Sequence, residues 1–166
     1  MMLKLFGAAL MTAGGAGAGF ALVRAEIARA DAVEDVRAAL GILRSEISLL
    51  ETPLPDIFDR LARDGPESAR DFFAALSAGV YPDGFAEAWR GALPRLALAT
   101  DAERVMDRLA LTLGRYGAGQ QCAELDAAGS ALADCVQRLR ERTRIRRGIC
   151  PGLGASAAAV IAVLLL

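Results

Sequence analysis

The sequence predicts an all-α protein: a helical bundle of about six helices, with two long antiparallel helices that continue into two transmembrane segments. Apolar residues recur at alternating steps of three and four, no strand-like alternation occurs, and both ends are apolar. The uncharged segments Leu5–Val23 and Gly148–Leu166 are nineteen residues each. As helices they would span roughly 28 Å, about the hydrocarbon thickness of a bilayer.

Residues 1–23 are predicted to form an uncleaved N-terminal transmembrane helix. Lys4, the apolar stretch and Ala16-Gly-Ala18 would also fit a signal peptide with an A-x-A cleavage site. Against cleavage, the amphipathic pattern resumes directly after Val23, as if one helix continued out of the membrane. We therefore favour an anchor over a leader.

Residues 24–147 are predicted to form one cytoplasmic helical domain. Its first helix runs to about Leu50 and carries a heptad seam, made of Val33, Val36, Leu40, Leu43, Ile47 and Leu50. Thr52 is expected to cap the next helix, with Pro53 at its first position. The apolar face of that second helix comprises Leu54, Ile57, Phe58 and Leu61.

Two shorter helices are expected next. Glu67–Ala78 reads as a helix whose inward side chains are Phe72, Phe73 and Leu76. Gly79–Gly84 contains a proline and is expected to be a turn. A short helix then follows around Phe85 and Trp89.

A capping box is expected to open the fifth helix. Thr100 and Glu103 have its T-x-x-E spacing. This helix is predicted to contain Gly114, where a glycine favours close helix packing, and to end at Gly117–Gly119. The sixth helix then carries a seam of its own, made of Cys122, Leu125, Gly129, Leu132, Val136, Leu139 and Thr143.

Residues 148–166 are predicted to form a C-terminal transmembrane helix. Six arginines precede it, namely Arg138, Arg140, Arg142, Arg144, Arg146 and Arg147. A buried core helix is the alternative, but core helices are rarely terminal and flanked by arginine. The positive-inside rule then places the central domain in the cytoplasm and both termini outside, and the arginines are suited to contact anionic lipid.

Composition excludes several classes of function. The middle of the chain holds eighteen arginines and all twenty acidic residues, which argues against a nucleic-acid partner. The absence of histidine removes His-based acid–base catalysis and most zinc sites. Gly14–Gly19 lacks the order of a phosphate loop, and Cys122 and Cys135 lie about 20 Å apart on one helix, too far to bridge. No catalytic residue, metal or cofactor is expected.

Five sequence blocks in order carry a family resemblance. They are the N-terminal Met2-Leu-Lys-Leu-Phe-Gly, then Leu43-Arg-Ser-Glu-Ile-Ser with Thr52-Pro-Leu-Pro, Ala88-Trp89 with Ala92-Leu93, Leu113-Gly-Arg with Gln120, and the arginine-rich helix with its Val/Ile/Leu tail. Together they resemble the stage III sporulation protein AB family of endospore-forming bacteria over nearly the whole chain.

The resemblance implies a non-enzymatic platform subunit of a channel or secretion-like complex in the mother-cell membrane facing the forespore. The helical domain is similar to the cytoplasmic domain of the type II secretion platform protein, which meets an ATPase. Expected partners are other membrane proteins of the complex, an ATPase and membrane lipid, with homo-oligomerisation left open. The alternatives are a generic membrane-anchored adaptor and a nucleotide-driven transport enzyme.

Eight residues of these blocks are candidates for partner binding: Arg44, Glu46, Thr52, Pro53, Pro55, Trp89, Arg115 and Gln120. Each has a structural alternative. The corner at Thr52–Pro55 would serve first as a cap and a sharp turn between helices. Arg44 and Glu46 would equally fit a solvated face, and Trp89 is more often a core residue than an interface anchor.

Overall fold

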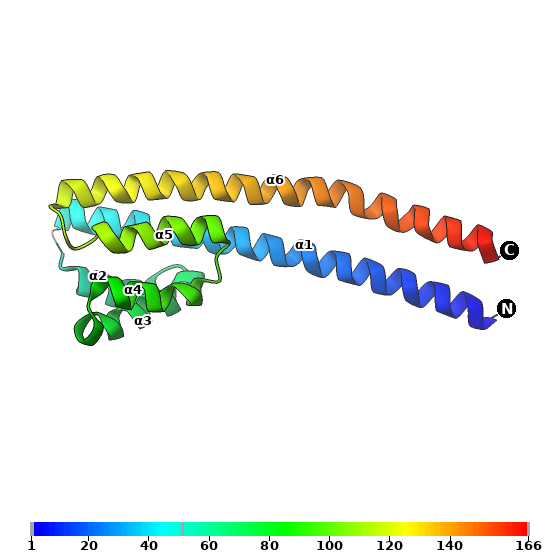
Figure 1. The fold of residues 1–166 in the computed structure, drawn as a ribbon, viewed down its shortest axis with the longest axis horizontal. Coiled ribbons are helices and arrows are strands. Elements are labelled where there is room, and N and C mark those ends of the chain that lie inside the picture. The colour runs from blue at the N-terminus through cyan, green and yellow to red at the C-terminus, as the bar shows by residue number, and fades with distance from the viewer. Residues whose placement is uncertain (1, 51, 166) are drawn as a thin grey trace. The chain divides into compact units, whose positions relative to one another are not determined.

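The computed structural model describes the backbone of residues 2–50 and 52–165 and the side chains of residues 21–49, 52–79 and 84–145. These residues form an all-α protein without a strand, as predicted (Figure 1). The elements are α1 (Met2–Ser45), the π-helical turn η1 (Glu46–Leu50), α2 (Leu54–Asp64), α3 (Glu67–Asp83), α4 (Phe85–Ala92), the 3-10 turn η2 (Leu93–Leu96), α5 (Thr100–Thr112) and α6 (Ala118–Leu165).

The chain divides into two compact units. We call Met1–Ala28 with Arg138–Leu166 the terminal unit, and Arg29–Gln137 the central unit. No helix within the described residues is long and apolar enough to cross a membrane. The predicted spans Leu5–Val23 and Gly148–Leu166 lie, apart from residues 21–23, outside the part whose side chains are described.

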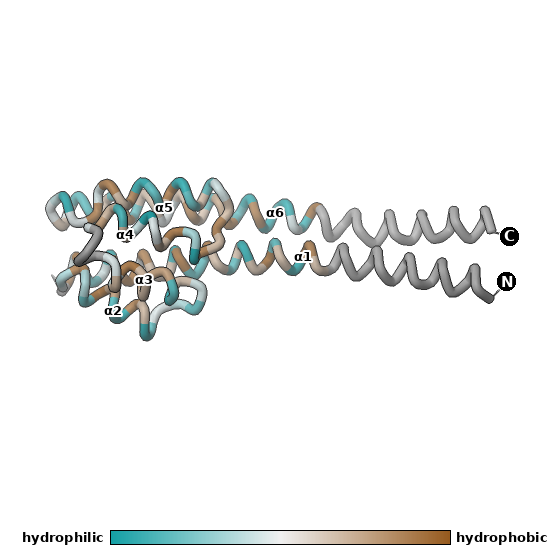
Figure 2. The backbone as a smooth tube through the Cα atoms, turned by 60° about the horizontal axis from the view of Figure 1, so that its bottom comes forward, coloured by the Kyte–Doolittle hydropathy of each residue, from teal (hydrophilic) through white to brown (hydrophobic). Residues whose placement is uncertain are grey.

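The predicted seam of α1 is buried in the central unit. Val33, Val36, Leu40 and Leu43 are at most 1% exposed, and Ile47 is also buried. Leu50 lies outside the described side chains. The seam of α6 is buried at Cys122, Leu125, Leu132, Val136 and Thr143, while Gly129 and Leu139 are half-buried. The coloured parts of both helices in Figure 2 alternate between hydrophobic and hydrophilic residues.

In the central unit α1 and α6 run antiparallel and side by side (Figure 1). Arg44 near the end of α1 contacts Asp126 near the start of α6, and the Cys122 thiol lies 3.8 Å from the Arg44 carbonyl oxygen. Burying two seams against each other removes a continuous row of apolar side chains from water, which is the main stabilisation available to such helices. The antiparallel pair is therefore confirmed here.

The short helices enclose an aromatic cluster. Phe72 packs edge-on against Phe73 and against Trp89, with ring centroids 4.9 Å apart in each pair. Trp89 is fully buried, and its indole Nε1 donates a hydrogen bond to the Met106 carbonyl at 2.8 Å. Each buried aromatic removes a large apolar area from water. This cluster joins α3, α4 and α5 into one core.

An aspartate on α1 caps another helix. The Ser68 backbone N–H, in the first turn of α3, donates to the Asp35 carboxylate at 3.1 Å. A carboxylate at this position satisfies an unpaired N–H and interacts favourably with the helix dipole. Asp35 therefore ties α1 to α3 across 33 residues of chain.

Both predicted threonine caps are wrong by one position. Helix α2 begins at Leu54 with Pro53 as its cap, and α5 begins at Thr100 with extended Ala99 as its cap. Neither helix has a side-chain cap hydrogen bond. A capping hydroxyl must belong to the non-helical residue at the boundary, so Thr52 lies before that place and Thr100 after it.

Two other helix boundaries differ from prediction. Helix α3 continues to Asp83, through the predicted turn, and ends at Gly84, whose φ of 83° favours glycine. Helix α5 ends at Thr112, so Gly114 is not inside a helix. With φ of 76°, Gly114 instead forms the turn toward α6 in a backbone conformation that L residues rarely adopt.

The buried seam predicts the effect of a charge at Leu43. In a fragment of residues 25–147, Leu43→Asp should lower the free energy of unfolding by about 3 kcal/mol or more, because it leaves an unpaired charge in a packed interior. Thermal melting followed by far-UV circular dichroism, with a helical spectrum expected for the parent fragment, measures this.

Leu49→Asp is the matched control, because Leu49 is 78% exposed on the following turn. It should change stability by no more than about 0.5 kcal/mol. Equal melting points for the two variants would contradict the packing.

Candidate functional site

The predicted partner residues mostly gather at one end of the central unit, where α1 ends and α2 and α6 begin. We call this the distal corner and define it by Arg44, Glu46, Leu49, Thr52–Pro55, Arg115 and Tyr116. A side chain added at Gly114 would lie 3.6 Å from Leu54 Cδ1, so the α5–α6 turn is adjacent to the start of α2. Trp89 lies elsewhere, buried in the aromatic cluster.

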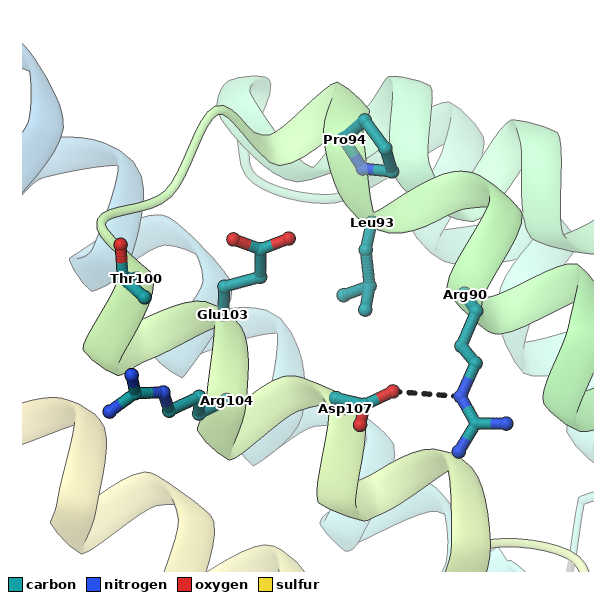
Figure 3. Close-up of a pocket in the computed structure, with 7 residues that line it drawn as sticks. All are labelled: Arg90, Leu93, Pro94, Thr100, Glu103, Arg104 and Asp107. Atoms are coloured by element: carbon teal, nitrogen blue, oxygen red, sulfur yellow. Dashed lines mark hydrogen bonds and ion pairs between the residues drawn. The ribbon is translucent and has the colours of Figure 1, made fainter.

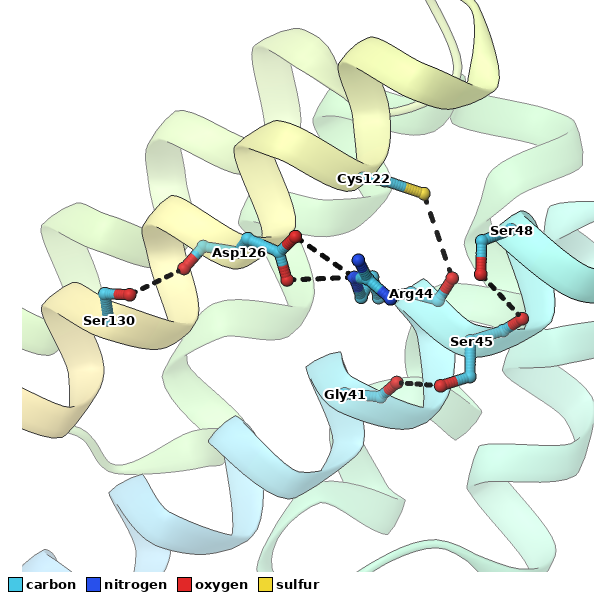
Figure 4. A network of polar contacts seen from close by, with 7 residues as sticks. All are labelled: Gly41, Arg44, Ser45, Ser48, Cys122, Asp126 and Ser130. Carbon is cyan, nitrogen blue, oxygen red and sulfur yellow. Dashed lines mark hydrogen bonds and ion pairs between the residues drawn. The ribbon is translucent and has the colours of Figure 1, made fainter.

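Arg44 pairs with Asp126 across the helix pair (Figure 4). Its Nε lies 2.9 Å from Oδ1 and 3.1 Å from Oδ2 of that carboxylate. The two side chains are 45% and 58% exposed, so water competes for both. Exposed pairs of this kind contribute at most about 1 kcal/mol, so Arg44 is not required for the fold.

At the end of α1, where the π-helical turn begins, two serine hydroxyls donate hydrogen bonds to backbone carbonyls (Figure 4). The Ser45 hydroxyl donates to the Gly41 carbonyl at 3.0 Å, and the Ser48 hydroxyl donates to the Ser45 carbonyl at 3.3 Å. These bonds supplement the backbone ladder at the end of the helix, where carbonyl groups begin to lack helical partners. The serines therefore support the local structure of the corner.

Glu46 holds the corner together and is almost buried. One carboxylate oxygen lies 2.5 Å from an Arg60 guanidinium nitrogen on α2, and the other accepts the Thr52 hydroxyl at 3.1 Å. Thr52 thus stabilises the corner through its hydrogen bond to Glu46, and it does not cap a helix. Arg60 is a residue that sequence analysis missed, because no local spacing links positions 14 apart.

Pro53 and Pro55 shape the start of α2. The Pro53 carbonyl accepts the N–H groups of Asp56 and Ile57, and Pro55 lies in the first turn, where its missing N–H has no helical acceptor to lose. Pro53 is exposed and Pro55 is half-buried. The prolines therefore fix the direction of α2 while presenting a rigid apolar surface.

Gln121 holds the α5–α6 turn, next to the partner-binding candidate Gln120. Its side chain accepts the Gly114 N–H at 3.2 Å and donates to the Tyr116 carbonyl at 2.6 Å. The side chain of Gln120 is exposed, and its backbone N–H donates to the Gly117 carbonyl. Arg115 is exposed on the turn that Gln121 stabilises.

The family-model comparison covers nearly the whole chain: the model described as stage III sporulation protein AB matches residues 4–166. The chain belongs to the stage III sporulation protein AB family. Membership confirms the resemblance and assigns the chain a role in stage III of sporulation. No curated protein and no solved structure matches this family member.

The described residues of this stage III sporulation protein AB family member also line a shallow cavity away from the distal corner (Figure 3). It has a volume of about 340 Å³ and is lined by Arg90, Leu93, Pro94, Thr100, Glu103, Arg104 and Asp107. Arg90 and Asp107 form an ion pair of 2.8 Å at its edge. Arginines and carboxylates alternate around it, and no group of His, Cys, Asp or Glu in the described residues could hold a metal ion.

The Glu46 contacts predict a local loss of stability. Glu46→Gln should lower the free energy of unfolding by about 1 kcal/mol, because the charged contact with half-exposed Arg60 is lost while Thr52 can keep its acceptor. Chemical denaturation of the fragment of residues 25–147 measures the change.

Asp71→Asn provides the control, since Asp71 is exposed on α3 and forms no ion pair with a described residue. Its effect should stay within about 0.5 kcal/mol. If both variants unfold at one denaturant concentration, Glu46 does not hold the corner.

Proposed function

We propose that this family member is a non-enzymatic platform subunit of a secretion-like channel complex in the mother-cell membrane facing the forespore. The observation that carries the proposal is the distal corner, an exposed surface built on a fixed scaffold. Leu49 and Tyr116 are large exposed side chains beside exposed Arg115 and Pro53. Apolar and arginine side chains of this kind are typical of protein interfaces.

The scaffold under this surface is suited to docking. Glu46, Thr52 and Arg60 hold the helix corner, and Gln121 holds the neighbouring turn. A surface that is ordered before binding loses less conformational entropy when a partner docks. The proposed partners are other membrane proteins of the sporulation complex, with an ATPase and a second copy of this chain as further candidates.

The different net charges of the two units support a protein whose two ends are embedded in the membrane. The terminal unit carries seven arginines and Lys4 against two acidic residues, a net charge of +6. The central unit carries eleven arginines against eighteen acidic residues, a net charge of −7. Arginines next to two apolar segments favour a cytoplasmic central domain with both termini outside. Residues 1–23 and 148–166 are the proposed spans.

Two other functions compete with the platform. A generic membrane-anchored adaptor would use the same corner without belonging to a channel complex. A nucleotide-driven transport enzyme is less favoured, because the sequence has no histidine and no phosphate loop. The likeness to the type II secretion platform protein supports a platform role by analogy of architecture.

Reporter fusions test the proposed topology. Alkaline phosphatase is active only after export, so a fusion after Gly117 in the central unit should be inactive. A fusion after Leu166 should be active, and a cytoplasmic reporter at both positions should give the opposite pattern. Phosphatase activity from the Gly117 fusion would place the central domain outside and reject the topology.

Charge reversal tests the distal corner. Arg44→Glu or Arg115→Glu should leave the membrane level of the protein unchanged, because each side chain is exposed and contributes at most about 1 kcal/mol. Either change should lower the yield of heat-resistant spores at least tenfold, with arrest after engulfment, and should reduce cross-linking to neighbouring subunits.

Two control variants test whether a loss of sporulation comes from the partner-binding surface. Arg63→Glu makes the same change at an exposed position near the far end of α2 and should sporulate normally. Arg44→Glu combined with Asp126→Arg restores the internal ion pair with reversed charges. Normal spore yield from this double variant would show that Arg44 serves the pair and not a partner.

A further inference from the structure

The described part of the terminal unit, residues 21–28 and 138–145, holds a group of exposed arginines. We define the arginine collar as Arg24 on α1 with Arg140, Arg142 and Arg144 on α6. None of the four forms a salt bridge with a described residue. The acidic residues of these segments are Glu26, which contacts the Thr143 hydroxyl at 3.4 Å, and exposed Glu141.

The spacing of these arginines distributes them around α6. Thr143 is buried, and its hydroxyl also donates to the Leu139 carbonyl at 2.8 Å, so this position faces α1. Successive helical residues are rotated by roughly 100°, so Arg142 and Arg144 project to opposite sides of the Thr143 position. The positive charge therefore lies on both flanks of the helix pair and does not form a single stripe.

Large apolar side chains are exposed among the same arginines. Leu22 is 60% exposed and Ile145 is 55% exposed. An exposed apolar side chain alone is ordinary, but here one lies close in sequence to a collar arginine on each helix, Leu22 to Arg24 on α1 and Ile145 to Arg144 on α6. Apolar groups beside arginine fit the boundary of a bilayer, where side chains insert and guanidinium groups reach the headgroups.

We propose that the arginine collar binds anionic phospholipid headgroups at the cytoplasmic face of the membrane. This inference rests on the proposed membrane topology. A guanidinium group forms paired, charge-assisted hydrogen bonds with phosphate oxygens, and anionic lipid also supplies a negative surface potential. Charge on both flanks and exposed Leu22 and Ile145 fit a surrounding lipid surface better than a nucleic-acid strand, which would contact one side.

Lipid binding to the full chain tests this proposal. The detergent-purified protein is titrated with phosphatidylglycerol or phosphatidylcholine, and bound lipids are counted by native mass spectrometry. The parent chain should bind phosphatidylglycerol more tightly. Arg140→Gln, Arg142→Gln and Arg144→Gln together should weaken that binding at least tenfold, because each cation near an anionic lipid surface contributes roughly fivefold.

Two matched variants control for fold and total charge. Arg63→Gln, Arg95→Gln and Arg108→Gln remove three exposed arginines from the central unit and should leave phosphatidylglycerol binding unchanged. Replacing the three α6 arginines of the collar by lysine keeps their charge and should retain most of the binding. A loss below tenfold in the glutamine variant, or an equal loss in the central-unit control, overturns the proposal.

Two further outcomes are distinguishable. If inorganic phosphate at equal concentration displaces the lipid, the collar is a site for free anions and the lipid proposal is wrong. If lipid preference is missing while the fusions still place the central domain inside and the C-terminus outside, the collar inference fails and the platform proposal stands. If the fusions place the central domain outside, the proposed function itself fails.

Discussion

Burial of one face of α1 is the constraint on which the central unit depends. The helix presents Val33, Leu40 and Leu43 to the core, and each is at most 1% exposed. Around this face it contacts α6 through Arg44 and α3 through Asp35, and Glu46 in the following turn η1 contacts α2. Three helices are thus positioned by α1 and its terminal turn, and the polar contacts lie where the apolar face meets water. The apolar face supplies most of the stabilisation, and the polar contacts fix direction and register.

The pattern of burial was predictable from sequence because it follows helical periodicity. Steps of three and four identify the residues of α1, and most of those of α6, that face inward, and the helix predicted over Glu67–Ala78 placed Phe72 and Phe73 in the core. Helix ends were harder to predict. Thr52 and Thr100 both resemble caps, yet each boundary lies one residue away, because extended backbone at Pro53 and Ala99 decides where the helix begins.

Contacts between distant residues could not be predicted locally. The bond from Ser68 to Asp35 and the pair of Glu46 with Arg60 join different helices, so their partners depend on how the helices pack. At the distal corner, sequence analysis also could not predict a side-chain contact. The contacts of Gln121 with Gly114 and Tyr116 depend on the turn that follows α5, whose end was not predicted.

The single tryptophan has a consequence for how the molecule can be observed. Trp89 is the only indole in the chain, it is fully buried against Phe72, and its N–H is bound to a backbone carbonyl. Indole emission shifts to longer wavelength when water reaches the ring. The tryptophan fluorescence of the protein therefore reports on one place, the junction of α3, α4 and α5, and gives no signal from the arginine collar. Unlabelled protein thus carries its own optical probe of whether this junction is folded.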